Sequence, residues 1–149
     1  MDIDSLQQQE RELIWSQFTA DTALDLGETL LEEARRSNLP IVIDIRTADQ
    51  TLFHAALPGA TPLNDLWALR KSNAVLKFHC SSLLLGTRMR GKGKTFADEG
   101  LDDVTYANHG GSFPIRLRGG MVVAAVTVSG LPQAEDHALV VAGITHCLR

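Results

Sequence analysis

The sequence of 149 residues contains no long apolar run, and its first ten residues, MDIDSLQQQE, are polar and acidic. A helix that spans a membrane needs about 20 consecutive apolar residues. A secretory signal peptide needs a basic start followed by an apolar stretch. Neither pattern is present, so we expect a cytoplasmic protein that has no membrane partner.

The sequence also lacks a basic excess and paired cysteines. Lysines and arginines number 14 against 18 aspartates and glutamates, which gives a net charge of −4 and predicts no nucleic-acid partner. The only cysteines, Cys80 and Cys147, form no C-x-x-C pair. We therefore expect reduced thiols that pack as small apolar side chains, and no metal site.

Standard catalytic motifs are absent as well. The sequence has no Gly-x-Ser-x-Gly, no His-Glu-x-x-His and no paired-carboxylate pattern, so it names no catalytic residue and leaves enzyme activity open. Gly93-Lys94-Thr95 looks like the end of a phosphate-binding P-loop. However, Arg88 stands where the first glycine of that motif belongs, so we expect no P-loop.

The sequence does contain the periodicity of helices and strands, over a length that suits a single domain of residues 1–149. Apolar spacing and capping residues predict four helices, at about 5–17, 19–37, 62–91 and 132–148. The second helix should turn Leu24, Gly27, Leu30, Leu31 and Ala34 inward. The third repeats Leu66, Leu69 and Leu76 at helical spacing, and it should break at Ser81-Ser82, where serine can cap a new helix.

Two hairpins are predicted from runs of apolar residues separated by turns. The strands should cover about 41–45, 51–57, 113–118 and 121–128. Gly119-Gly120 can form the turn of the second hairpin, and the last strand is apolar on both faces, which is typical of a strand covered on both sides. Two hairpins, with too many helices for one face, predict an α+β fold with an antiparallel sheet.

Two glycine turns flank the second hairpin and form the strongest candidate site. His109-Gly110-Gly111 precedes its first strand, and consecutive glycines can fold the backbone into a nest of N–H groups that holds an anion. Ser129-Gly130 follows its second strand, just before a helix N-terminus with more N–H groups. Because the ends of an antiparallel hairpin are adjacent, we expect both turns to meet at one ligand site. The alternative is two ordinary turns, with Ser129 capping the helix and His109 exposed.

Other charged residues are less specific candidates. Arg88 or Arg116 would add positive charge to an anion site. Asp44 and Arg46 lie on one face of a predicted strand, and His54 lies on the neighbouring strand. They form either a surface ion pair or, if helices cover that face, a buried functional cluster.

Four segments of the chain resemble a known family. They are LFHAALPGATPLND at 52–65, RGKGKTF at 90–96, HGGSFPI at 109–115 and TVSGLPQAEDHALVV at 127–141. They resemble a family of small bacterial and fungal proteins that is related to the haem-degrading-domain (HbpS/GlcG-like) proteins. The resemblance covers nearly the whole chain. It implies a profilin-like antiparallel sheet of about four to five strands with helices on both faces, and a homo-oligomer.

The resemblance to the wider group also implies haem as a candidate ligand. Haem needs an axial donor such as histidine, and His109 and His54 are the available donors. The leading hypothesis is a cytoplasmic homo-oligomer that binds a small anionic ligand at the two glycine turns, with haem a candidate through its propionates. The alternative is a non-catalytic structural or adaptor protein that acts through oligomer and partner interfaces.

Overall fold

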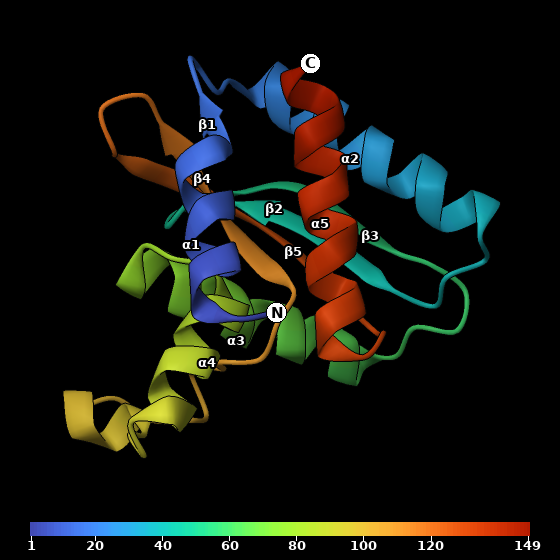
Figure 1. Ribbon diagram of the computed structural model, residues 1–149. Helices are drawn as coiled ribbons and strands as arrows, with labels where there is room; N and C mark the ends of the chain where they lie inside the picture. Colours follow the sequence, from blue (N-terminus) through green and yellow to red (C-terminus); the bar gives the residue numbers. More distant parts are fainter.

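A five-stranded sheet lies at the centre of the protein, and five α-helices surround it in the computed structural model, which describes residues 1–149 (Figure 1). The strands are β1 (Ile14–Trp15), β2 (Val42–Arg46), β3 (Thr51–Ala56), β4 (Ser112–Leu117) and β5 (Val122–Ser129). The helices are α1 (Ile3–Glu12), α2 (Ala20–Arg36), α3 (Pro62–Phe78), α4 (Ser82–Gly91) and α5 (Gln133–Leu148), and a 3-10 helix, η1 (Phe96–Glu99), follows α4. The predicted α+β fold class is confirmed. No helix is both long and apolar enough to cross a bilayer.

The strand order in the sheet is β1-β4-β5-β2-β3. The neighbours from β4 to β3 pair antiparallel, whereas β1 runs parallel to β4 with Ile14 opposite Arg116. This edge strand corrects the prediction of one helix over 5–17 and of a purely antiparallel sheet. The helix ends at Glu12 because Leu13 adopts φ −92° and ψ 75°, and the next two residues join the sheet.

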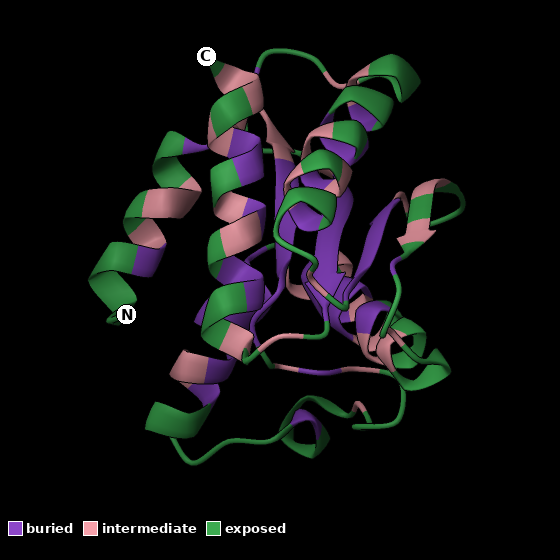
Figure 2. Cartoon of the chain, turned by 90° about the vertical axis from the view of Figure 1, so that its right-hand side faces the viewer, coloured by how far each residue is buried: buried purple, intermediate pink, exposed green.

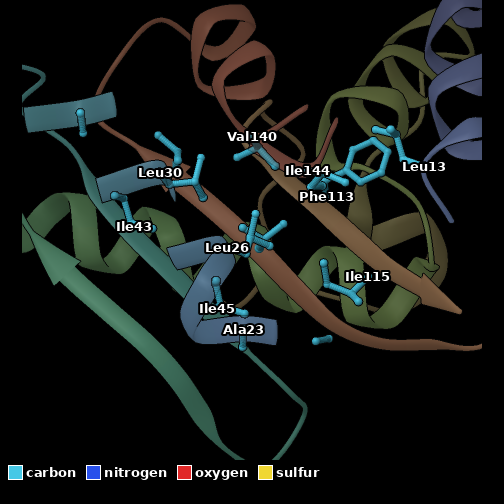
Figure 3. Close-up of a cluster of buried hydrophobic side chains, with 14 of the residues drawn as sticks. Leu13, Ala23, Leu26, Leu30, Ile43, Ile45, Phe113, Ile115, Val140 and Ile144 are labelled. Atoms are coloured by element: carbon cyan, nitrogen blue, oxygen red, sulfur yellow. The ribbon is translucent and has the colours of Figure 1, made fainter. Parts of the chain in front are cut away.

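The main hydrophobic core lies between the sheet and the pair α2 and α5 (Figure 3). Each central strand turns alternate residues toward this core, as a strand with period two must. Its labelled members in Figure 3 come from α2, β2, β4 and α5 and from the C-cap of α1: Leu13, Ala23, Leu26, Leu30, Ile43, Ile45, Phe113, Ile115, Val140 and Ile144. Figure 2 shows that burial is concentrated on the strands and that the helices expose their outer sides. The last helix turns Val140 and Ile144 toward this core, and both are fully buried.

The helix predicted for 62–91 is two helices, and the break falls where serine caps were expected. Ser81 is the N-cap of α4, and its Oγ accepts a hydrogen bond from the N–H of Leu84 at 3.1 Å. The preceding helix, α3, covers the opposite face of the sheet from α2 and α5, against β5, β4 and β2. Helices therefore lie on both faces of the sheet.

The leucine repeat of α3 faces away from the sheet. Leu66 and Leu69 are exposed, whereas Ala68, Lys71 and Val75 are buried. The helix adopts this orientation because the sheet surface beneath it consists of small or polar residues such as Thr127. A helix face of small or polar residues packs against that surface better than leucines would. The inward placement of Leu24 on α2 is likewise wrong, because that side chain is exposed.

A second, smaller hydrophobic cluster joins α1 to α4. Leu6 of α1 is fully buried in it, against residues of α3, α4 and η1 that include Leu84 and Phe96. The first helix is therefore packed on segments that are far away in sequence. Figure 1 shows α1 beside α4 and α5 rather than apart from the body of the protein.

Candidate functional site

A pocket of about 250 Å³ lies where β5 ends and α5 begins, with α3 along one side. Residues from three separate segments line it: Asn64, Trp67, Lys71, His109, Ser129, Gly130, Leu131, Gln133 and Asp136. The register of the second hairpin explains why these segments meet. Ser112 is opposite Thr127, so the residues before β4 lie beside those after β5. The structure thus brings His109 and Ser129-Gly130 to one pocket.

A buried ion pair stands at the base of this pocket. Nζ of Lys71 lies 3.1 Å from Oδ2 of Asp136 and donates to the carbonyl oxygen of Val128 at 3.3 Å. The other oxygen of Asp136 accepts a hydrogen bond from the N–H of Leu131 at 3.0 Å. Burial lowers the pKa of Lys71 and raises the pKa of Asp136, and the opposite charge of the partner acts against each shift.

Gly111 makes the close approach of these groups possible. Its φ is +135°, and a Cβ at this position would overlap the carbonyl oxygen of Val128 and lie 2.8 Å from Nζ of Lys71. The N–H of Gly110 donates to Oε1 of Gln133 at 2.9 Å. The N–H of Ser112 donates to Oγ of Ser82 at 3.0 Å. One N–H group of the predicted anion nest, that of Gly110, thus binds a protein oxygen, and Gly111 lets the turn approach Lys71 and Val128.

Ser129 and Gly130 form the opposite side of the pocket. Gly130 has φ +146°, and a Cβ there would overlap the carbonyl oxygen of Pro40. The N-cap of α5 is Pro132, and this helix start has no side-chain hydrogen bond. The alternative role considered for Ser129, as the cap of this helix, is therefore wrong. The residue is one of those that line the pocket instead.

His109 stands at the rim of the pocket and is exposed. Its ring packs edge-on against Trp67, with 5.2 Å between centroids, and the guanidinium of Arg70 lies 4.5 Å from the centroid of the Trp67 ring on α3. Partial burial lowers the pKa of His109, and the positive charges of Arg90, Lys71 and Arg70 act in the same direction. Its imidazole is therefore neutral at pH 7.

His54, proposed from the sequence as a ligand residue, lies in a separate cluster. Its Nδ1 is 2.7 Å from Oδ2 of Asp44 and its Nε2 is 2.9 Å from Oδ1 of Asp65. Arg46 binds both oxygens of Asp44, at 2.6 and 2.8 Å. Asp44 is fully buried, so the cluster is a partly buried network rather than a surface pair, and it ties β2 and β3 to the start of α3.

Arg88 and Arg116 are also remote from the Lys71 pocket. Both line a different pocket, together with Glu10 of α1. The guanidinium of Arg116 donates to Oε1 of Glu10 at 3.3 Å and to the carbonyl oxygen of Gly120 at 3.1 Å. These arginines therefore supply no charge to the site around His109.

The two charged residues at the base of the pocket were not predicted from the sequence. Lys71 occupies the same helix face as Ala68 and Val75, and a lysine within such a stripe of buried positions is the signal that marks it. Asp136 lies in the first turn of α5, where a carboxylate is favourable beside the helix N-terminus. Its partner could not be read locally, because Lys71 is 65 residues away.

The architecture defines an α+β class that other solved structures share. The crystal structure of HbpS matches with a TM-score of 0.71 at 20% identity, over 91% of this chain and 94% of that chain. PduOC, solved as a haem complex, matches with a TM-score of 0.73 at 17% identity, over 86% of this chain and 93% of that chain. These similarities concern the fold alone.

Sequence similarity places the chain within a family. It belongs to the HbpS-like family, described as haem degrading protein HbpS-like, whose family model matches residues 18–145. The UPF0303 protein of Streptomyces coelicolor is 52% identical over 140 residues, which cover 93% of this chain and 89% of the relative. The crystal structure of Ybr137w matches with a TM-score of 0.88 at 30% identity, over 100% of this chain and 91% of the Ybr137w chain. The family resemblance inferred from the sequence is confirmed.

Proposed function

We propose that this protein binds a small organic anion, of the carboxylate class, in the pocket at Lys71. The proposal rests on the buried Lys71 ammonium, which lines the pocket and has a third N–H donor beyond the two that bind Asp136 and Val128. Both oxygens of Asp136 already accept hydrogen bonds, so its charge is compensated within the protein. A carboxylate at Lys71 gains a charge-assisted hydrogen bond.

The charge at the rim of the pocket also favours an anion. The pKa of His109 is lowered by the positive charges of Arg90, Lys71 and Arg70, although the whole chain carries a net charge of −4. The neutral imidazole of His109 offers one N–H donor to a ligand. Two of the residues first selected from the sequence, His109 and Ser129, thus keep a role as ligand contacts in the proposal.

Haem fits this pocket only in part. The volume of about 250 Å³ falls below the roughly 300–1,000 Å³ of pockets that enclose drug-sized ligands, and only Trp67 and Leu131 offer apolar surface. In the proposed arrangement, one propionate of a porphyrin reaches Lys71 while the ring stays outside, with neutral His109 as the available iron donor. Membership of the HbpS-like family and the haem complex of the similar fold PduOC support haem as a candidate.

The proposal can be tested by tryptophan fluorescence. The chain has two tryptophans: Trp67 lines the pocket, and Trp15 is buried in the core. Titration with acetate, succinate and haemin should give a saturable change that the Trp67→Phe variant loses. His109→Ala should weaken binding about tenfold, or ~1.4 kcal/mol. The exposed His146, at the end of α5, provides the matched control variant His146→Ala.

The haemin titration separates the two candidate ligands. A saturable Soret shift at stoichiometric protein that His109→Ala abolishes would identify haem as the ligand. Saturation by succinate without a Soret shift would favour a small carboxylate. A fluorescence response that is unchanged in His109→Ala, or a loss of affinity in His146→Ala as large as that in His109→Ala, would contradict binding at this pocket.

Exposed leucines on α3 favour a second candidate function, in which the protein acts through an interface with its own subunits or a partner. Leu63, Leu66 and Leu69 are 60%, 49% and 38% exposed, and they form one apolar stripe on the outer face of the helix. Light scattering of wild type and Leu63→Ser/Leu66→Ser tests this function. A loss of assembly that Val104→Ser, at another exposed apolar residue, does not cause would support the interface. A monomer at all concentrations would contradict self-association through the stripe.

A further inference from the structure

A second pocket, of about 300 Å³, lies between α1, α4 and β4. Its walls include Arg11 of α1, Arg88 of α4 and Arg116 of β4, and we call it the arginine pocket. None of its residues lines the pocket at Lys71. It is therefore a separate site, to which the function proposed above assigns no role.

Positive charge dominates the arginine pocket. Glu10 is its one carboxylate and stands against three guanidinium groups. Both Glu10 oxygens are occupied, because Oε1 accepts from Arg116 at 3.3 Å and Oε2 accepts from the N–H of Ser81 at 2.8 Å. Glu10 therefore holds Arg116 in place and leaves the charges of Arg11 and Arg88 uncompensated.

The remaining guanidinium groups have few protein partners. Arg11 donates to the side-chain oxygen of Gln8, and Arg88 forms no ion pair with any carboxylate. Cys80, which also lines the pocket, does not supply the missing negative charge, because burial raises the pKa of its thiol to about 11. Each guanidinium carries five N–H donors in a planar fork, so most donors of Arg11 and Arg88 are available to a ligand.

Packing of the first helix fixes the position of these donors. Leu6 is fully buried between α1 and α4, and β1 pairs with β4 so that Ile14 lies opposite Arg116. Arg11 and Arg116 are thus brought together by the docking of residues 3–15. This segment lies outside the residues 18–145 that match the HbpS-like family model, so the arginine pocket depends on a part of the chain beyond the matched region.

We infer that the arginine pocket binds a small oxyanion of the phosphate class. Arginine forks match the geometry of phosphate oxygens with paired N–H donors, and the two guanidinium charges that Glu10 leaves uncompensated give the positive charge that an oxyanion requires. The lining has no aromatic ring apart from the imidazole of His79, so the pocket offers little stacking surface for a nucleotide base. The ligand class is therefore inorganic phosphate or pyrophosphate rather than a nucleotide.

The inference can be tested by titrating the full chain with pyrophosphate. Binding is measured by calorimetry and by the side-chain Nε–H signals of arginine in NMR spectra. Saturable binding should shift the signals of Arg11 and Arg88. R88Q and R11Q should each weaken binding at least tenfold. R118Q is the matched control, because Arg118 follows the strand that carries Arg116 and has the same charge, but it is exposed and does not line the pocket.

Several outcomes would overturn the inference. They are an absence of saturable binding at millimolar pyrophosphate, an equal loss in R118Q, and unchanged affinity in both R88Q and R11Q. Binding that His109→Ala removes and R88Q leaves intact would assign the anion to the Lys71 pocket instead. ADP should bind no more tightly than pyrophosphate, and a clear preference for ADP would contradict the assignment to a free oxyanion.

Discussion

The ammonium of Lys71 lies 3.1 Å from Oδ2 of Asp136, and neither side chain is more than 5% exposed. Removal of one member of such a pair leaves the other charge buried and unpaired. Lys71→Met should therefore lower the free energy of unfolding by about 3–5 kcal/mol, as measured by urea denaturation. Lys71→Met/Asp136→Asn should regain part of this loss. A single variant as stable as wild type would show that the pair contributes little.

Substitution of Gly111 should destabilise the same region, because the backbone conformation of this residue and its close neighbours leave no room for a side chain. Gly111→Ala would force a Cβ against the carbonyl oxygen of Val128 at φ +135° and should cost about 2 kcal/mol or more in unfolding free energy. Gly93 is the matched control, because its φ is also positive, at +63°, but nothing lies within 4 Å of an added Cβ. Gly93→Ala should cost only about 1 kcal/mol. An equal loss of unfolding free energy in both variants would show that the close contact at Gly111 is not the cause.

Protonation of His137 should make the stability depend on pH. Its imidazole is 1% exposed, with Nε2 2.7 Å from Oε1 of Gln9, and burial lowers its pKa from 6.5 to about 4. The unfolded chain therefore takes up a proton before the folded chain does. The stabilisation is fully present above pH 6.5 and is lost as the pH falls toward 4, by about 3 kcal/mol in total.

Urea denaturation between pH 7 and 4 measures the effect of His137. The curve of His137→Gln should be flatter than that of wild type, because glutamine does not titrate. His146→Gln removes an exposed imidazole from the same helix and is the control. Parallel curves for wild type and His137→Gln would contradict this source of pH dependence.

The contact between α2 and α5 should be sensitive to the loss of core volume. Leu30 is 1% exposed and packs in the main core, whereas Leu24 on the same helix is 42% exposed. Leu30→Ala should cost about 2–5 kcal/mol in unfolding free energy, because it leaves a cavity. Leu24→Ala should cost less than about 1 kcal/mol. Chemical denaturation of the two variants compares them directly.

Local sequence patterns predicted most of the fold. The four longer strands and the caps at Ser81 and Pro132 depend on neighbouring residues, and each was found close to its predicted position. The two-residue strand β1 was missed because its pairing with Arg116 connects residues about 100 positions apart. The buried face of α3 was also missed. Its orientation is set by the small and polar sheet surface beneath it, not by its own leucines.

The candidate site was predictable only in outline. Hairpin geometry correctly indicated that the residues around Gly111 and Ser129 would be neighbours. The role of Lys71 depends on α3 crossing the end of β5, which no local pattern specifies. Arg88 and Arg116 were proposed for this site because of their charge alone. In the structure they line a different pocket, because charge does not specify where a residue lies in the fold.

The first helix makes its polar contacts with parts of the chain that are synthesised much later. Glu10 bonds to Ser81 and Arg116, which are 71 and 106 residues away, and Gln9 bonds to His137, 128 residues away. Closing such long loops is entropically costly until the intervening chain is ordered. Docking of α1 must therefore wait until α4, β4 and α5 are in place, so it completes the folding of this domain rather than starting it.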